Sequence, residues 1–120
     1  MAKGIKVSMN SALTDVPARG VHVNVTEGKN KPIHVEVIGN RHDGAVADIS
    51  YAPADPAARK LANAENPSRW NKIVAAVDDF VQKPKNAKKL ANVADAAAQN
   101  FPDNTRNFDD TAHELKKICG

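Results

Sequence analysis

The first half of the chain alternates apolar and polar residues, which is the pattern of β-strands with one buried face. The alternation runs through four short segments rich in Val, Ile and Met: 5–9 (IKVSM), 21–25 (VHVNV), 33–38 (IHVEVI) and 45–51 (AVADISY). Enrichment in β-branched residues at a period of two favours strands over helices. We expect these segments to pair as successive antiparallel hairpins, in a four-stranded β-meander over residues 5–51.

The second half of the chain changes to a helical period. Asp55 with Pro56, and Asn66 with Pro67, each place a capping residue before a proline, which is typical of a helix start. Apolar stripes then predict helices over about 55–65, 67–82, 85–101 and 108–119. The main core stripe is Trp70, Ile73, Val74, Val77, Phe80 and Val81. Strands followed by helices indicate an α+β fold, with three to four helices packed on the apolar face of the sheet.

The change of pattern near residue 52 is expected to separate two layers of one domain. A chain of 120 residues suits a single hydrophobic core. We therefore predict one α+β domain over residues 1–120, with a β-meander layer at 1–52 and a helical layer at 53–120.

Strand parity divides the predicted sheet into an apolar face and a polar face. Odd-numbered positions such as Val23 and Val35 form the apolar face toward the helices. Even-numbered positions form the polar face, which carries Lys6, Ser8, His22, Asn24, His34, Glu36, Asp48 and Ser50. In the most compact register, His22 lies opposite Glu36, and Glu36 lies opposite Asp48.

The remaining polar residues are expected to extend this arrangement. Asn24, His34 and Ser50 form the adjoining row across the strands, and Ser8 extends the row of His22.

The polar face has two interpretations. Two carboxylates and an imidazole suit a divalent metal such as Zn, Mn or Fe, and paired carboxylates suit acid–base chemistry. His22, Glu36 and Asp48 are then candidate catalytic and metal-ligating residues, with His34 as a further ligand or base, in a metal-dependent hydrolase or nuclease. The favoured interpretation is an ordinary sheet face open to water, where the His22–Glu36 pair is one cross-strand contact.

Two apolar residues interrupt the polar face. Ile38 and Val46 are expected to lie next to each other there, and an exposed apolar pair indicates a covering element, either a helix of this chain or a partner. The sequence also has no specific enzyme motif. The favoured function is therefore a small binding or accessory protein that acts through contacts with another macromolecule, with another protein as the expected partner.

The stretch KPKNAKK places four lysines at the entrance of a predicted helix: Lys83, Lys85, Lys88 and Lys89. Lysines beside the free amides of a helix N-terminus can hold a phosphate or a nucleic-acid backbone. The overall charge is only +3, from 17 Lys and Arg against 14 Asp and Glu, and aromatic residues make up 4% of the chain. Nucleic-acid binding is therefore a further hypothesis, ranked behind protein binding and metal-dependent hydrolysis.

The remaining features of the sequence concern the cellular compartment of the protein. A single cysteine, Cys119, excludes an internal disulfide and favours a reducing compartment. No apolar run has the length of a signal peptide core or a membrane span. We expect a soluble cytoplasmic protein that needs no cofactor and contacts no membrane. The sequence leaves the formation of homo-oligomers open.

Overall fold

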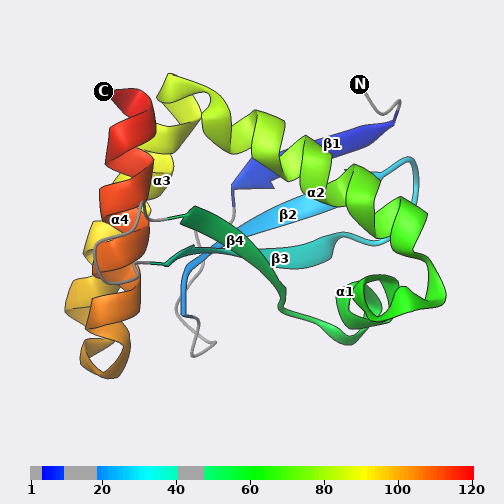
Figure 1. Ribbon diagram of the computed structural model, residues 1–120, viewed down its shortest axis with the longest axis horizontal. Helices are drawn as coiled ribbons and strands as arrows, with labels where there is room; N and C mark the ends of the chain where they lie inside the picture. Colours follow the sequence, from blue (N-terminus) through cyan, green and yellow to red (C-terminus); the bar gives the residue numbers. More distant parts are fainter. Residues whose placement is uncertain (1–3, 10–18, 41–47) are drawn as a thin grey trace.

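The computed structural model describes residues 4–9, 19–40 and 48–120, and its elements follow the predicted order of strands and then helices (Figure 1). The strands are β1 (Ile5–Met9), β2 (Val21–Glu27), β3 (Ile33–Asn40) and β4 (Asp48–Pro53). They form one antiparallel sheet in the order β1-β2-β3-β4. The predicted four-stranded meander is confirmed.

The helical half begins at the predicted caps. The elements are α1 (Pro56–Lys60), the kinked turn η1 (Leu61–Glu65), α2 (Pro67–Gln82), α3 (Pro84–Asn100), the 3-10 turn η2 (Pro102–Asn104) and α4 (Thr105–Cys119). Asp55 Oδ1 accepts the backbone N–H of Ala58 at 2.8 Å, and Asn66 Oδ1 accepts that of Arg69 at 3.4 Å. Each cap satisfies an amide that has no partner within its helix.

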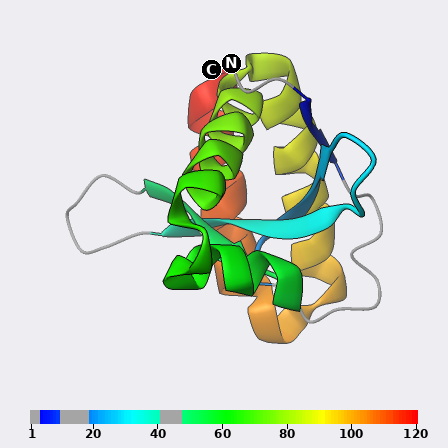
Figure 2. The ribbon, with the colours of Figure 1, turned by 90° about the vertical axis from the view of Figure 1, so that its right-hand side faces the viewer.

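The helices cover one face and one end of the sheet. α2 crosses the sheet and packs on β1 and β2, as the two views in Figures 1 and 2 show. α3 and α4 lie side by side at the end of the sheet, where α4 packs along β3. Within the described residues, no helix combines the length and the apolar character that a bilayer crossing requires.

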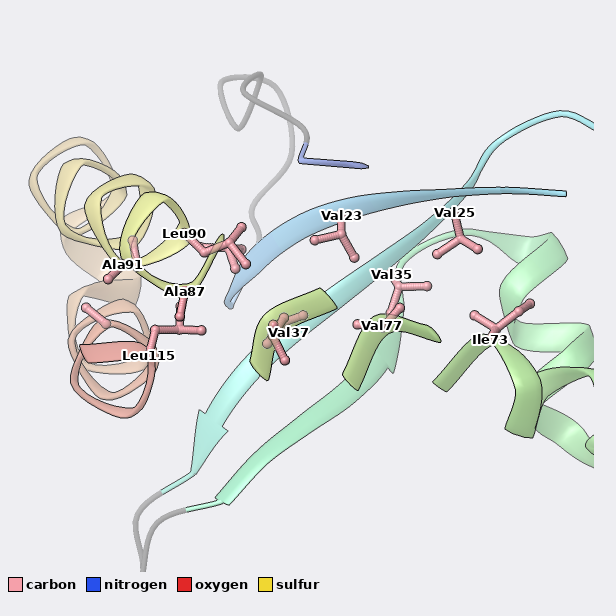
Figure 3. Packing of buried hydrophobic residues seen from close by; sticks show 14 residues of the cluster. Val23, Val25, Val35, Val37, Ile73, Val77, Ala87, Leu90, Ala91 and Leu115 are labelled. Carbon is pink, nitrogen blue, oxygen red and sulfur yellow. The ribbon is translucent and has the colours of Figure 1, made fainter. Parts of the chain in front are cut away.

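The main core lies between the odd-numbered face of the sheet and the helices (Figure 3). The sheet contributes five almost fully buried valines: Val21, Val23, Val25, Val35 and Val37. The helices contribute Ile73 and Val77 from α2, Ala87, Leu90 and Ala91 from α3, and Leu115 from α4. The predicted parity is therefore confirmed, since the odd-numbered positions face the helices.

The depth of burial differs from the expected core stripe. Trp70 and Phe80 of α2 pack against the core but are only partly buried. The largest fully buried side chain is instead Phe108, whose ring lies 6.0 Å from that of Phe101 between their centroids. α4 also starts at Thr105, before the predicted start at residue 108. The helix that closes the core is thus longer than its apolar stripe indicates.

Gly39 lets α4 approach the sheet closely. Its N–H donates to Thr111 Oγ1 at 2.8 Å, and the Thr111 hydroxyl donates to the carbonyl of Asn107 at 2.9 Å. A Cβ atom at Gly39 would lie 2.6 Å from the carbonyl oxygen of Asp110. Only a residue without a side chain fits here without a shift of α4.

Candidate functional site

His22 and Glu36 face each other on β2 and β3, as predicted. The register pairs them, and His22 Nε2 lies 3.0 Å from Glu36 Oε1. The N–H of Ala54 donates to the carbonyl of His34 at 3.2 Å, so the even-numbered residues of β3 direct their backbone groups toward β4. His22 and Glu36 are therefore a non-hydrogen-bonded pair of the β2–β3 ladder, in which Cα atoms lie only about 4.5 Å apart. This short spacing brings the two side chains into contact.

His34 and Asn24 form a second polar pair beside the first. They are also opposite each other in the register, and His34 Nδ1 lies 2.6 Å from Asn24 Oδ1. The rings of His22 and His34 stack across the diagonal, with 6.5 Å between their centroids and 28° between their planes. The two predicted rows are thus neighbours, and the described polar face has two imidazoles and one carboxylate close together.

The polar face is not open to water at the first pair. His22 is 5% exposed and Glu36 is 9% exposed, whereas Asn24 and His34 are partly buried. The expected water-exposed sheet face is therefore wrong at this point. A buried ionisable pair requires a mutual hydrogen bond, because each unpaired partner would carry a desolvation penalty. The pair is part of the packed interior.

Asp55 connects this part of the sheet to α1. One carboxylate oxygen caps α1, and the other, Oδ2, accepts the backbone N–H of His34 at 2.8 Å. Ala54 lies opposite His34 and donates its N–H to the His34 carbonyl, so the carboxylate takes the place that the Ala54 carbonyl would have in a continued ladder. The Asp55 carboxylate thus accepts one hydrogen bond from α1 and one from β3, which anchors α1 to β3.

Asp48 does not lie opposite Glu36. The register pairs Asp48 with Asn40, and it pairs Glu36 with Ala52. Asp48 and Ala52 are four residues apart along β4, which corresponds to about 13 Å. The predicted Glu36–Asp48 pairing is wrong because β3 continues to Asn40 and β4 begins only at Asp48, which displaces the register by four positions.

Two other expected neighbours also differ. Ser50 lies opposite Ile38 instead of in the row of His34. Ser8 lies opposite Asn24, so it does not extend the row of His22.

The corrected register bears on the metal hypothesis. Metal sites in proteins ordinarily use three or more side-chain ligands. Among the described residues, no group of three or more His, Cys, Asp or Glu side chains has the arrangement of a metal site. His22 and Glu36 bind each other, and the position of Asp48 in β4 is remote from them.

Ile38, which was expected to form an exposed apolar pair with Val46, is not exposed. Ile38 is buried and lies opposite Ser50, while Val46 lies outside the described residues. Ile38 is therefore part of the interior, and it offers no exposed apolar surface to a partner.

The lysine-rich helix entrance is fully at the surface. Lys85, Lys88 and Lys89 are exposed in the first turns of α3. Lys83 precedes the helix in an extended conformation, with its Nζ 3.9 Å from the carboxylate of Asp79. This geometry is that of solvated lysines at a helix start, with no second feature that indicates a ligand.

β1 has a hydrogen-bonding edge that parity alone does not reveal. The N–H of Gly28 donates to the carbonyl of Gly4 at 3.1 Å, which places the hydrogen-bonded pairs of the β1–β2 ladder at even-numbered residues of β1. The N–H and C=O groups of Ile5, Val7 and Met9 therefore point away from β2. In residues 4–9, 19–40 and 48–120, no strand pairs with this side of β1.

The side chains of β1 make this edge amphipathic. Ile5, Val7 and Met9 are partly buried against the core, while Lys6 and Ser8 are exposed on the opposite face. The signal for this edge was present in the sequence. The first strand of a meander has a neighbour on one side only, and IKVSM contains neither proline nor glycine.

β4, the other edge of the sheet, is less suited to pairing. The hydrogen bond from Ala54 to His34 places Ile49, Tyr51 and Pro53 at the positions whose backbone groups point outward. Pro53 has no N–H to donate. β1 is therefore the more complete of the two edges as a template for another strand.

Comparisons of the chain with protein-family models, with curated proteins and with solved structures found no match.

Proposed function

We propose that this protein is a small binding or accessory protein whose partner adds a strand to β1. The observation that supports the proposal is the row of outward N–H and C=O groups of Ile5, Val7 and Met9. In strand addition, main-chain hydrogen bonds supply affinity, and alternate side chains supply specificity.

The side chains of β1 indicate what such a strand looks like. On the core side, Ile5, Val7 and Met9 are only partly covered, so apolar residues at alternate positions of the added strand would extend the core. On the other side, the exposed Lys6 favours a polar or acidic neighbour and opposes pairing with another lysine. A charged residue on an edge strand also limits unspecific pairing.

The two other hypotheses have less structural support. A metal-dependent hydrolase lacks a third ligand beside His22 and Glu36 in the described part of the chain. The lysines at the start of α3 are exposed without further features of a phosphate site. The edge of β1, in contrast, presents a set of directional donors and acceptors.

Val7→Pro is a sharp test of this proposal. The N–H of Val7 points away from β2, so a proline here removes an outward donor and leaves the β1–β2 ladder intact. Val7→Ile is the matched control, because it keeps both the N–H and a β-branched side chain. Circular dichroism and thermal unfolding check that each variant folds.

Random-peptide display on the wild-type protein supplies the probes. We expect selected peptides with apolar residues at alternate positions that bind wild type and Val7→Ile alike, and Val7→Pro at least about tenfold more weakly, as the loss of a buried hydrogen bond implies. Amide exchange at Ile5, Val7 and Met9 should slow on binding. Peptides that bind folded Val7→Pro as tightly as wild type would contradict strand addition at β1.

A further inference from the structure

We infer that the strand added to β1 is β1 of a second copy of this chain, in an antiparallel, two-fold symmetric dimer. The inference rests on the proposed function and names its partner. The two four-stranded sheets would become one continuous eight-stranded sheet. An isologous contact of this kind closes on itself, so it gives a dimer instead of a filament.

The backbone parity of β1 suits pairing with itself. A two-fold axis at Val7 places Val7 opposite Val7 of the second copy and Ile5 opposite Met9 of the second copy. The hydrogen-bonded pairs of this register consist of odd-numbered residues, and these are the residues whose N–H and C=O groups point outward. Each hydrogen-bonded pair exchanges two bonds, so the contact forms about six backbone hydrogen bonds.

The side chains favour this register over its neighbours. Lys6 lies opposite Ser8 of the second copy, and the same contact recurs by symmetry. A two-fold axis at Lys6 would instead place two lysines directly opposite each other, which is destabilising. A register that pairs odd with even positions would misalign the outward backbone groups and mix the two faces. Val7 at the centre therefore gives full overlap of β1 without like charges directly opposite each other.

The two-fold axis also keeps the apolar face continuous. It runs perpendicular to the sheet, so the face that carries Ile5, Val7 and Met9 is the same in both copies. α2 packs on β1 in each copy, and the two α2 helices would lie on the same side of the joined sheet. The partly buried side chains of β1 would thereby gain cover from both copies.

Exchanging Ser8 for a charged residue tests the register. Ser8 is exposed, so Ser8→Glu and Ser8→Lys both place a charge at the surface of the monomer. In the dimer, glutamate would face Lys6 of the second copy, whereas lysine would repel it. We expect sedimentation equilibrium of the full chain at low salt to show a dimerisation constant severalfold tighter for Ser8→Glu and severalfold weaker for Ser8→Lys. High salt should reduce both differences. Equal dimerisation of these two variants would overturn the register.

Cysteine cross-linking tests the same register without measuring affinity. In a Cys119→Ser background, one chain carries Lys6→Cys and another carries Ser8→Cys. These positions form a non-hydrogen-bonded pair with Cα atoms about 4.5 Å apart, within reach of a disulfide. We expect the mixed disulfide to form faster than either disulfide between identical chains. If the mixed disulfide formed no faster than the disulfides between identical chains, the inference would be wrong.

Val7→Pro separates this inference from the proposed function. We expect wild type and Val7→Ile to dimerise, and Val7→Pro to dimerise at least about tenfold more weakly. If wild type is monomeric at all concentrations but its peptide binding still depends on Val7, the second copy is not the partner and strand addition stands. If dimerisation is unaffected by Val7→Pro, the dimer uses another surface and the inference is wrong.

Discussion

His22 and Glu36 form a hydrogen-bonded pair across β2 and β3, with 3.0 Å between Nε2 and Oε1, and both side chains are buried. The pair lies on the sheet face opposite the main core, where alternation alone indicates contact with water. Its burial changes the expected energetics. An exposed cross-strand pair contributes little, whereas a buried group that loses its partner carries the full cost of desolvation.

Removing the partner of His22 should therefore destabilise the protein. We expect Glu36→Ala to lower the free energy of unfolding by about 1–3 kcal/mol, because His22 loses its buried hydrogen bond. Glu36→Gln keeps an acceptor oxygen at similar volume and should cost less. Urea unfolding measures both. Equal losses for the two variants would show that the hydrogen bond contributes little to stability.

The same pair predicts weak binding of divalent metals. The side chains of His22 and Glu36 are hydrogen-bonded to each other, and among the described residues no third metal-ligating side chain joins them. Calorimetric titration of Zn or Mn into metal-free protein should give no binding at micromolar affinity or tighter, for wild type and for Glu36→Gln alike. Micromolar binding that disappears in Glu36→Gln would restore the metal-site hypothesis.

The close contact between Gly39 and α4 should be sensitive to a single methyl group. Gly39→Ala would place Cβ 2.6 Å from the Asp110 carbonyl oxygen, so α4 must move and the free energy of unfolding should fall by about 1–3 kcal/mol or more. Thr111→Val removes the acceptor of the Gly39 N–H, whereas Thr111→Ser keeps it. Thermal unfolding should rank Thr111→Ser above Thr111→Val. The opposite order would contradict the role of the hydroxyl.

Phe108 should be more important for stability than Phe80. Phe108 is fully buried, so Phe108→Ala should cost about 3–5 kcal/mol, in the range typical of buried aromatic truncations. Phe80 is partly buried on α2 and serves as the control, with a smaller expected loss. Chemical denaturation of the two variants measures the difference. A larger loss for Phe80→Ala would place the centre of the core under α2 instead.

Because of Tyr51, the free energy of unfolding should depend on pH in the alkaline range. Burial raises the pKa of Tyr51 above its ordinary value of about 10, and the hydrogen bond that its hydroxyl donates to Asp78 at 2.8 Å raises it further. The folded state then holds the proton more tightly than the unfolded state. This stabilisation is complete below about pH 10 and is lost as the pH rises further.

Absorbance titration can follow this effect directly, because Tyr51 is the only tyrosine of the chain. We expect ionisation of the folded protein well above pH 10, and a weaker loss of stability between pH 9 and about 11 in Tyr51→Phe than in wild type. Ionisation of folded wild type at the ordinary pKa would contradict the contact with Asp78.

Local sequence was sufficient for the strand and helix pattern. Period-two alternation assigned Val23 and Val35 to the core, because successive side chains of a strand point to opposite faces. The most compact register between the second and third segments then paired His22 with Glu36 correctly. Asp55 and Asn66 marked helix starts, because a side-chain acceptor before a proline satisfies amides that the helix leaves free. These features depend on a few neighbouring residues, so they can be recognised from the sequence alone.

The tertiary structure decided the features that depend on distant segments. The register between β3 and β4 pairs Asp48 with Asn40 instead of Glu36, and strand parity alone does not distinguish registers that differ by an even number of positions. The burial of His22 and Glu36 depends on the packing around the sheet, which alternation does not describe. The outward direction of the Val7 backbone depends on which pairs of the β1–β2 ladder are hydrogen-bonded, and both parities of that ladder are compatible with the same sequence pattern.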